Sequence, residues 1–555
     1  MTQTQPPGET SVPAKQYPDL HDHVARLEEE GLLVRVSRPI NKDTELHPLV
    51  RWQYLGLDED EDRRAFLFDN VVDSKGRSYD IPVVVGVFSA NSRVYEIAMG
   101  IDDPEKRQGV WKKAVEEQHA PVLIPSEHAP IHEVIYTGDE LNSFEKGVGH
   151  LPVPISTPGW DNAPYVSSSN FITKDPETGV HNIGTYRAMI KSNTRIGMNP
   201  SVEMNQGIYD HFLKYRERSE PMPAVLCIGG PPCIPFVAKQ KLDMQLDEYH
   251  VAGGLVGAPL RVVEARTVPV LVPADAEICI EGYINTEYLE PEGPFGESHG
   301  YMNPKEYNAF MDVTAITRRE KPYLMSILSQ IAPSEASVQR KLSSSWLFLN
   351  HLTRIGITCV SRVQLHETSG MTRYCIMQCK PNAADSEVWR AMYACLTLNG
   401  GWPKIVIAVD EDIDPQDADA VWWAMGIRST PHKDIEIVKR REPGHGPRGE
   451  DEDERGIASE SGVLWDARAK HKMPPTSLPK REHMENARKI WEELGLPKLH
   501  EHSRWFGYNL GEWNEELDEE AALAEQSDYF VTGDKIAEQR VKFGEVSMNS
   551  KYYKD

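Results

Sequence analysis

Apolar residues recur at helical spacing near the start of the chain. Leu20, Val24 and Leu27 fall on one face of a helix, and a glycine four residues later is suited to end it. The apolar run that follows predicts a strand, and the segments AFLFDNV and IPVVVGVF predict two more. The chain therefore opens with helix and strand together, as a mixed α/β domain does.

The middle of the chain, residues 150–330, has a different pattern. Short apolar runs such as PAVLCIGGPP, LRVVEA and FMDVTAITRR follow one another between Gly and Pro residues, which predicts a barrel or a sandwich. Residues 330–350 have the pattern of a connecting helix. Strands alternating with helices after it predict an α/β unit, and beyond about residue 480 the chain is predicted to be helical and strongly acidic.

Composition narrows the class of protein. The 555 residues are more than one core usually holds, so two or three domains are expected. A formal net charge of −25 argues against nucleic acid and anionic membrane surfaces as partners. The first fifteen residues lack the apolar stretch of a signal peptide, and seven scattered cysteines without C-x-x-C favour neither disulfides nor zinc. A cytoplasmic protein is expected.

Two glutamates, Glu292 and Glu297, lie five positions apart across a Gly-Pro-Phe-Gly segment. Proline and glycine exclude a regular helix there, so the segment is predicted to be a tight loop that can aim both carboxylates into one space. Neighbouring carboxylates separate their pKa values, so one can act as an acid while the other stays charged. The alternative is a turn with two exposed glutamates.

Three further positions offer chemistry, each with a plainer alternative. In the segment HNIGTYR, Asn182 can bind a hard cation and Arg187 can bind a carboxylate or phosphate, although both types are common at surfaces. Glu248 stands where a helix is predicted to begin, as a helix-end carboxylate or as a metal ligand. Lys380 ends an apolar strand and extends into water or meets a phosphate.

In their order along the chain, these segments resemble the UbiD family of prenylated-flavin-dependent (de)carboxylases, over roughly residues 18–470. The loop from Glu292 to Tyr301 is the most specific likeness, followed by Asn182 with Arg187 and by Glu248 with its Ala-Gly continuation. The remaining likenesses are Phe68 to Val71, Ser89 to Arg93, Asp410 to Pro415, and Arg428 to Pro431.

The resemblance implies an α+β fold, α/β in the broad sense, of several parts. A disordered tail (1–16) would precede a small N-terminal α/β domain (17–145) and a central split β-barrel related to flavin reductases (146–330). A C-terminal α/β domain that dimerises (331–480) and an acidic helical extension (481–555) would follow, with the active site between barrel and C-terminal domain. Both a homodimer and a homohexamer are compatible with this arrangement.

The resemblance also implies residue roles in catalysis. Arg187, Glu292 and Glu297 match the family's catalytic Glu-Arg-Glu network. Glu297 would donate the proton after CO2 leaves, while Arg187 would pair with Glu292 and orient the substrate carboxylate.

The implied cofactor is prenylated FMN, made by a separate flavin prenyltransferase. The backbone through Thr185, Tyr186 and Arg187 would line it, and Lys380 would add positive charge at its phosphate.

A divalent ion, manganese in the first place and otherwise iron or magnesium, would hold that phosphate through Asn182 and Glu248, with a potassium ion beside it. The family's third ligand is a histidine about twenty residues beyond the asparagine, and here no histidine precedes His211. Glu203 and Gln206 are the candidates, and Glu203 is the better ligand chemically.

The expected function is therefore reversible non-oxidative decarboxylation of an aromatic or α,β-unsaturated acid through a substrate–prenylated-flavin adduct. An aryl-CoA thioester such as phthaloyl-CoA is included in this class. The alternatives are a metal-dependent hydrolase or lyase without flavin, and a non-catalytic subunit of a carboxylase complex.

Overall fold

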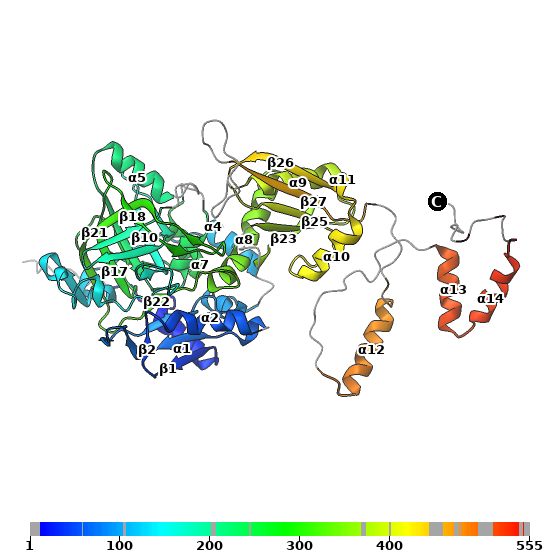
Figure 1. The fold of residues 1–555 in the computed structure, drawn as a ribbon, viewed down its shortest axis with the longest axis horizontal. Helices are drawn as coiled ribbons and strands as arrows, with labels where there is room; N and C mark the ends of the chain where they lie inside the picture. Colours follow the sequence, from blue (N-terminus) through cyan, green and yellow to red (C-terminus); the bar gives the residue numbers. More distant parts are fainter. Residues whose placement is uncertain are drawn as a thin grey trace, which may run out of the picture. The chain divides into compact units, whose positions relative to one another are not determined.

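The computed structural model describes most of the chain in two compact units (Figure 1). The first comprises residues 1–408 and 431–466, and the second residues 409–430 and 467–555. The described residues are 12–57, 59–103, 107–200, 207–242, 246–367, 373–398, 401–442, 459–470, 477, 479–497, 514–542, 545 and 548. Most of the predicted disordered tail, 1–16, therefore lies outside them.

The predicted N-terminal helix is α1 (Leu20–Glu29). Asp19 caps it, since its side chain accepts from the backbone N–H of Asp22 and the Asp22 side chain bonds back. The buried face of α1 carries the three predicted apolar residues.

A four-stranded sheet beside α1 has the order β1-β3-β6-β22. Its last strand comes from far along the chain, because Leu324 pairs with Val83, and this ties the N-terminal region to the end of the central domain. The strands are β1 (Leu33–Val36), β3 (Ala65–Phe68), β6 (Val83–Val85) and β22 (Leu324–Ser326). The other elements before the central domain are β2 (Ile40–Asn41), α2 (Leu46–Gly56), η1 (Asp60–Asp62), β4 (Val71–Val72), β5 (Ser78–Tyr79), α3 (Ser92–Ala98), α4 (Arg107–Glu116), β7 (Val122–Leu123), η3 (Ser126–His128), η4 (Pro130–His132), η5 (Gly138–Asn142) and η6 (Val148–His150).

The central domain is built on one large antiparallel sheet, in which the main path runs β11-β10-β14-β17-β21-β13-β12-β9 and both β8 and β18 pair with β21. All seven residues of β14 are buried, as expected for a strand covered on both faces. The strands are β8 (Val134–Thr137), β9 (Tyr165–Val166), β10 (Ser169–Lys174), β11 (His181–Thr185), β12 (Ala188–Ser192), β13 (Arg195–Met198), β14 (Met222–Ile228), β17 (Ile278–Ile284), β18 (Glu290–Glu292) and β21 (Glu306–Arg318). Around them lie α5 (Gly207–Glu217), α6 (Cys233–Lys239), α7 (Glu248–Val256), β15 (Arg261–Glu264), β16 (Leu271–Pro273), β19 (Phe295–Gly296) and β20 (Met302–Asn303).

The predicted α+β class is confirmed, and the large sheet of the central domain does not close into a barrel within the described residues. Within the described residues the path of the large sheet ends at β11 on one side and β9 on the other, and these two strands do not pair. Closure needs a hydrogen-bonded register between the end strands. Here α6 and α7 pack against β11 and occupy that edge of the fold instead.

The connecting helix predicted over 330–350 is α8 (Glu335–Arg354). It begins at a capping box in which Ser334 and Ser337 bond each other's backbone N–H groups. Leu342 and Trp346 pack against the first hydrophobic core, whereas Phe348 belongs to a second core. One helix thus joins both cores.

The second core lies under a five-stranded sheet of order β23-β24-β25-β27-β26. Its elements are β23 (Val360–Leu365), β24 (Tyr374–Cys379), α9 (Asp385–Thr397), β25 (Ile405–Val409), α11 (Pro431–Asp434), β26 (Ile435–Arg441) and β27 (Glu460–Asp466). The alternation of strands and helices predicted after residue 350 is therefore present.

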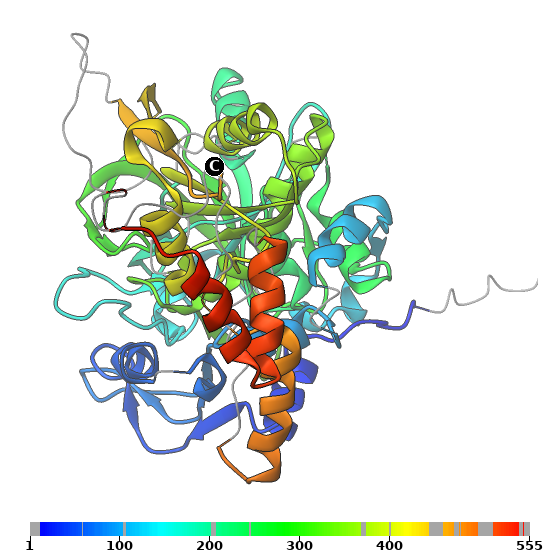
Figure 2. The same cartoon turned by 90° about the vertical axis from the view of Figure 1, so that its right-hand side faces the viewer.

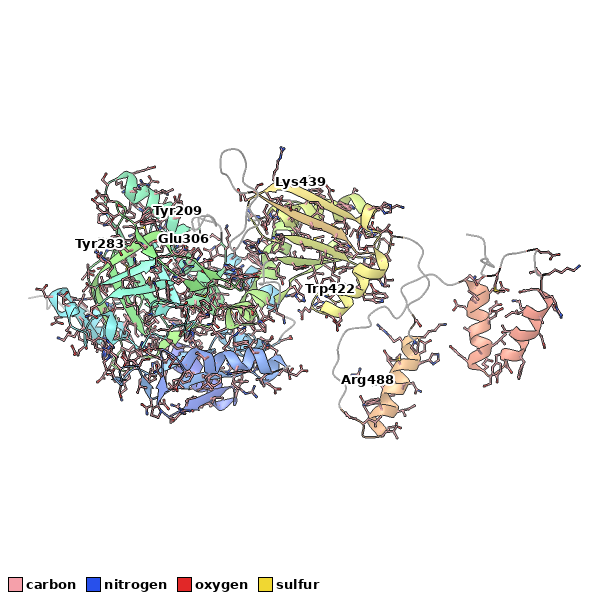
Figure 3. The ribbon with its side chains drawn as sticks, in the orientation of Figure 1. Tyr209, Tyr283, Glu306, Trp422, Lys439 and Arg488 are labelled. Atoms are coloured by element: carbon pink, nitrogen blue, oxygen red, sulfur yellow. The ribbon has the colours of Figure 1, made fainter. Side chains whose placement is uncertain are left out.

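The second unit contains α10 (Ala418–Arg428) and the acidic C-terminal helices α12 (Arg481–Glu493), α13 (Glu515–Glu525) and α14 (Tyr529–Glu538). Arg428 ends α10 and bonds Asp412 at 2.5 and 2.7 Å. Trp422 lies on the exposed side of α10 and is 59% exposed (Figure 3). Figure 2 shows α13 and α14 side by side, which their contacts bear out. The predicted helical extension is confirmed.

All seven cysteines are buried and free. Of the helices in the described part of the chain, none combines the length and apolar character that crossing a membrane requires.

Candidate active site

Arg187 lies between Glu292 and Glu297 in the central domain. Its Nε and Nη2 donate to the two Glu292 oxygens at 3.0 and 2.7 Å, and its Nη1 donates to Glu297 Oε1 at 2.5 Å. Two parallel bonds to one carboxylate fix the plane of the guanidinium, because a bidentate pair allows a single orientation. The third bond then fixes the position of Glu297.

Local structure explains how the two glutamates reach one arginine. Glu292 ends β18 and pairs in register with Glu306 of β21. Gly293 then turns the chain with φ +99°, and a Cβ at this position would lie 2.7 Å from the carbonyl oxygen of Pro304. A glycine is therefore needed to bring Glu297 back towards Glu292.

The two carboxylates differ in environment although they share one arginine. Glu292 is fully buried and also accepts from the Asn308 amide at 3.2 Å, whereas the Glu297 side chain is 17% exposed. The Arg187–Glu292 ion pair therefore has no net charge and lies inside the protein. The carboxyl of Glu297 is the one that faces the open space.

That space is a cavity of about 250 Å³. Of the described residues, five basic side chains and one acidic side chain, Glu297, line it, so this lining is positive in a protein of net charge −25. It suits an anionic ligand. Its walls also carry apolar side chains, among them Phe295, Ile327 and Leu347, which suit the flat apolar part of such a ligand.

The predicted metal ligands Asn182 and Glu248 lie on elements that pack together. His181 donates its backbone N–H to Asp247 Oδ2 at 3.0 Å. This bond holds the two segments together, so the next residues in them, Asn182 and Glu248, lie close to one another. Within the described residues, Glu248 Oε2 is buried without a hydrogen-bond partner, and so is the amide nitrogen of Asn182, whose metal-binding atom would be the carbonyl oxygen beside it. Burial and the charge of Asp247 raise the pKa of Glu248 to about 8, although the Ile183 N–H opposes this. A cation bound here would relieve the cost of the buried carboxylate.

The third metal ligand, predicted to be Glu203 or Gln206, lies outside the described residues. Among those that are described, no three His, Cys, Asp or Glu side chains form a metal-binding group. The next histidine, His211, bonds Thr173 Oγ1 at 2.9 Å, and burial lowers its pKa to about 4.

The structure brings most of the predicted cofactor residues to one wall. Thr185, Tyr186 and Arg187 line the cavity. Lys380 does not: it follows β24 as an exposed residue, and its backbone N–H donates to Cys359 O. Its predicted role at a phosphate is not supported by this position.

Four basic residues at the cavity were not singled out from the sequence: Lys239, Lys241, Arg340 and Arg373. They come from α6 and the segment after it, from α8, and from the residue before β24. Each stands in an ordinary amphipathic context, so only a family alignment or the fold itself reveals that they converge.

Behind the Glu297 loop lies another carboxylate absent from the sequence-based candidates, Asp161. It accepts from the Thr157 N–H at 2.7 Å. Burial raises the pKa of Asp161 to about 6, although that hydrogen bond and the charge of Arg187 both lower it.

Three family models match the chain in succession. The N-terminal domain of 3-octaprenyl-4-hydroxybenzoate carboxy-lyase (UbiD) matches residues 24–110, its Rift-related domain residues 123–331, and its C-terminal domain residues 343–446. Together they span more than half of the chain.

Solved structures and a curated relative agree with these matches. The UbiD-class enzyme HmfF from Pelotomaculum thermopropionicum, in complex with FMN, is 26% identical, with a TM-score of 0.72 over 85% of this chain and 100% of that one. An evolved dimeric form of HmfF in complex with prFMN is 25% identical, with a TM-score of 0.70 over 83% and 97%. Vanillic acid decarboxylase from Sedimentibacter hydroxybenzoicus, in closed form, is 25% identical, with a TM-score of 0.73 over 87% and 100%. An uncharacterized protein of Aquifex aeolicus is 28% identical over 76% of this chain and 87% of its own length.

Proposed function

Because the chain belongs to the UbiD family of carboxy-lyases, we propose that it catalyses the reversible non-oxidative decarboxylation of an aromatic or α,β-unsaturated acid. The observation that carries the proposal is the arrangement of Arg187 between two glutamates, of which Glu297 alone faces the cavity. A cavity whose described lining is positive and has one acidic group suits an anionic substrate that must receive a proton after it loses CO2.

The proposed cofactor is prenylated FMN, since a relative of this fold binds it. Bound in the cavity, it would supply the electron sink that decarboxylation at an sp2 carbon needs. Thr185 and Tyr186 would line it, and the basic side chains would meet its phosphate. The unpartnered Glu248 oxygen and the side-chain carbonyl oxygen of Asn182 fit a divalent cation such as manganese, with potassium nearby.

The chain's own residues would then divide the work. The guanidinium of Arg187 would attract and orient the substrate carboxylate beside the Glu297 carboxyl. Loss of CO2 leaves a carbon that needs a proton, and Glu297 is the acidic side chain placed to deliver it from the cavity wall. Glu292 would keep Arg187 charged and in position.

Aryl-CoA thioesters such as phthaloyl-CoA belong to the substrate class that we propose. We also propose that the enzyme works in the cytoplasm, that a flavin prenyltransferase supplies the cofactor, and that it assembles as a homodimer or homohexamer. The support is the seven buried free thiols and the evolved dimeric form of one relative.

The first test is the ligand that the protein carries. The chain would be co-expressed with a flavin prenyltransferase, purified without oxygen, and its absorbance and the mass of the released ligand recorded. We expect prenylated FMN and exchange of labelled CO2 into an aromatic acid. A folded, colourless protein that holds metal but no flavin would refute the proposal in favour of a metal-dependent hydrolase or lyase.

The second test concerns Glu297. Glu297→Gln should retain the flavin and lose about 10²–10⁴-fold in turnover, since a general acid contributes that much. The control is Glu290→Gln on β18, whose carboxylate pairs with Lys191 and Arg195 and does not line the cavity. An active Glu297→Gln enzyme would rule out the assigned role.

A further inference from the structure

The loop that carries Glu297 is supported from behind as well as by Arg187. Gly296, the residue before Glu297, lies directly against Thr157, because a Cβ at position 296 would be 2.6 Å from Thr157 Oγ1. Only a glycine allows two segments to approach so closely. A shift of Thr157 therefore moves the backbone to which Glu297 is attached.

Thr157 is itself held from two sides. Its backbone N–H donates to Asp161 Oδ2 at 2.7 Å, and its carbonyl oxygen accepts from the Asp161 N–H at 3.1 Å, so the two residues close a tight turn. The Thr157 hydroxyl accepts from Gln330 Nε2 at 3.2 Å, and the same amide group donates to the carbonyl oxygen of Ser156. These contacts leave Thr157 little freedom to move away from the glycine.

The bond to Asp161 is the strongest of these contacts by chemistry. A carboxylate that accepts from a backbone N–H forms a charge-assisted bond, which is roughly twice as strong as a neutral one. Asp161 is not among the described residues that line the cavity. We therefore expect its effect on a reaction in the cavity to pass through the residues that it holds.

We propose that Asp161 is a positioning residue for proton transfer: by holding Thr157 against Gly296, it keeps the Glu297 carboxyl directed into the cavity. The inference rests on the proposed function, because it takes Glu297 as the proton donor. Small displacements of a reacting group are costly, since a shift of about 1 Å can lower a rate about 100-fold. Asp161 thus affects the rate without contacting the substrate.

The first test separates turnover from binding in the flavin-loaded enzyme. Asp161→Ala should lower kcat about 10- to 100-fold and change KM and flavin content less than about threefold, because the acid is displaced while the cavity lining remains. Asp161→Asn should retain most of the activity, since its amide oxygen can still accept from the Thr157 N–H. An Asn variant as impaired as the Ala variant would show an effect of charge rather than of position, and would overturn the inference.

Two further variants act on the same chain of contacts. Thr157→Val keeps the backbone N–H but loses the bond from Gln330, so it should lower kcat with KM unchanged. Unchanged kcat in this variant would contradict the inference, even if Asp161→Ala did not fold. In a Glu297→Gln background, Asp161→Ala should cost no further turnover, because no acid remains to be positioned. Additive losses in that double variant would overturn the inference.

The matched control is Asp73→Ala, in a tight turn of the N-terminal region. Asp73 accepts from the backbone N–H groups of Lys75 and Arg77, each at 2.9 Å, and is not one of the described residues at the cavity. This variant should lose stability and keep its kcat.

A crystal structure of Asp161→Ala tests the inference without turnover. It should show Glu297 displaced from Arg187, and an unmoved Glu297 would overturn the inference. A parent enzyme that carries no flavin and exchanges no CO2 would instead overturn the proposed function.

Discussion

Removing the positive charge of Arg187 should leave the fully buried carboxylate of Glu292 without its cationic partner and so destabilise the fold. In Arg187→Met the Glu292 side chain, which is 0% exposed, keeps the Asn308 amide but loses two bonds from a guanidinium. Taking one partner from a buried ion pair costs about 3–5 kcal/mol of folding free energy. The double variant Arg187→Met/Glu292→Gln removes both charges and should recover about 2–3 kcal/mol of that loss as a coupling energy.

The assay is urea unfolding followed by circular dichroism, without added cofactor, because ligand binding would add its own stabilisation. The control is Arg195→Met, whose pairs with Glu290 and Asp312 involve a side chain that is 40% exposed and should be worth about 0–1 kcal/mol. The reasoning fails if Arg187→Met costs less than about 1 kcal/mol. It also fails if the double variant is as unstable as the sum of the two single ones.

Other predictions follow from single contacts. Burial lowers the pKa of His47 to about 4, so the native state excludes a proton that the unfolded chain binds below pH 6.5. Stability should fall from pH 6.5 towards 4 by at most about 1.4 kcal/mol per pH unit from this group, and His47→Gln should reduce the slope of unfolding free energy against pH. Ser334→Ala removes the cap on the Ser337 N–H and should cost about 1 kcal/mol in urea unfolding, whereas Ser334→Asp should retain most of it. Glu248→Gln should weaken Mn²⁺ binding about tenfold or more by calorimetry, and unaltered affinity would remove Glu248 from the metal site.

The sequence identifies the two glutamates of the site more clearly than it identifies their environments. Glu292 and Glu297 could be found because proline and glycine between them exclude a helix, and that argument depends on nearby residues alone. Which of the two would be buried depends on the pairing of β18 with β21, and no local pattern contains it. The same limit applies to Lys380. The sequence shows that a lysine follows a strand, but whether that lysine lies at the cavity depends on how the strand is placed in the fold.

The fold class could be predicted from the sequence because it depends on local patterns. Helical and strand periodicities are local, so α1, α8 and the acidic C-terminal helices follow from the pattern of apolar residues. Whether a sheet closes depends on its two end strands, here β11 and β9, and on the helices at its edge. The basic residues of the cavity were missed because Lys239 and Arg340, distant in sequence, meet only in three dimensions.

The double attachment of α8 has a mechanical consequence. A continuous helix of twenty residues is about 30 Å long and bends little, so it connects its two ends rigidly. Trp346 is anchored in one core and Phe348 in the other, with no break between them and Arg340. A displacement of the C-terminal sheet is therefore transmitted along the helix axis to the cavity wall. We therefore expect the position of the second core and the position of the cavity wall at Arg340 to change together.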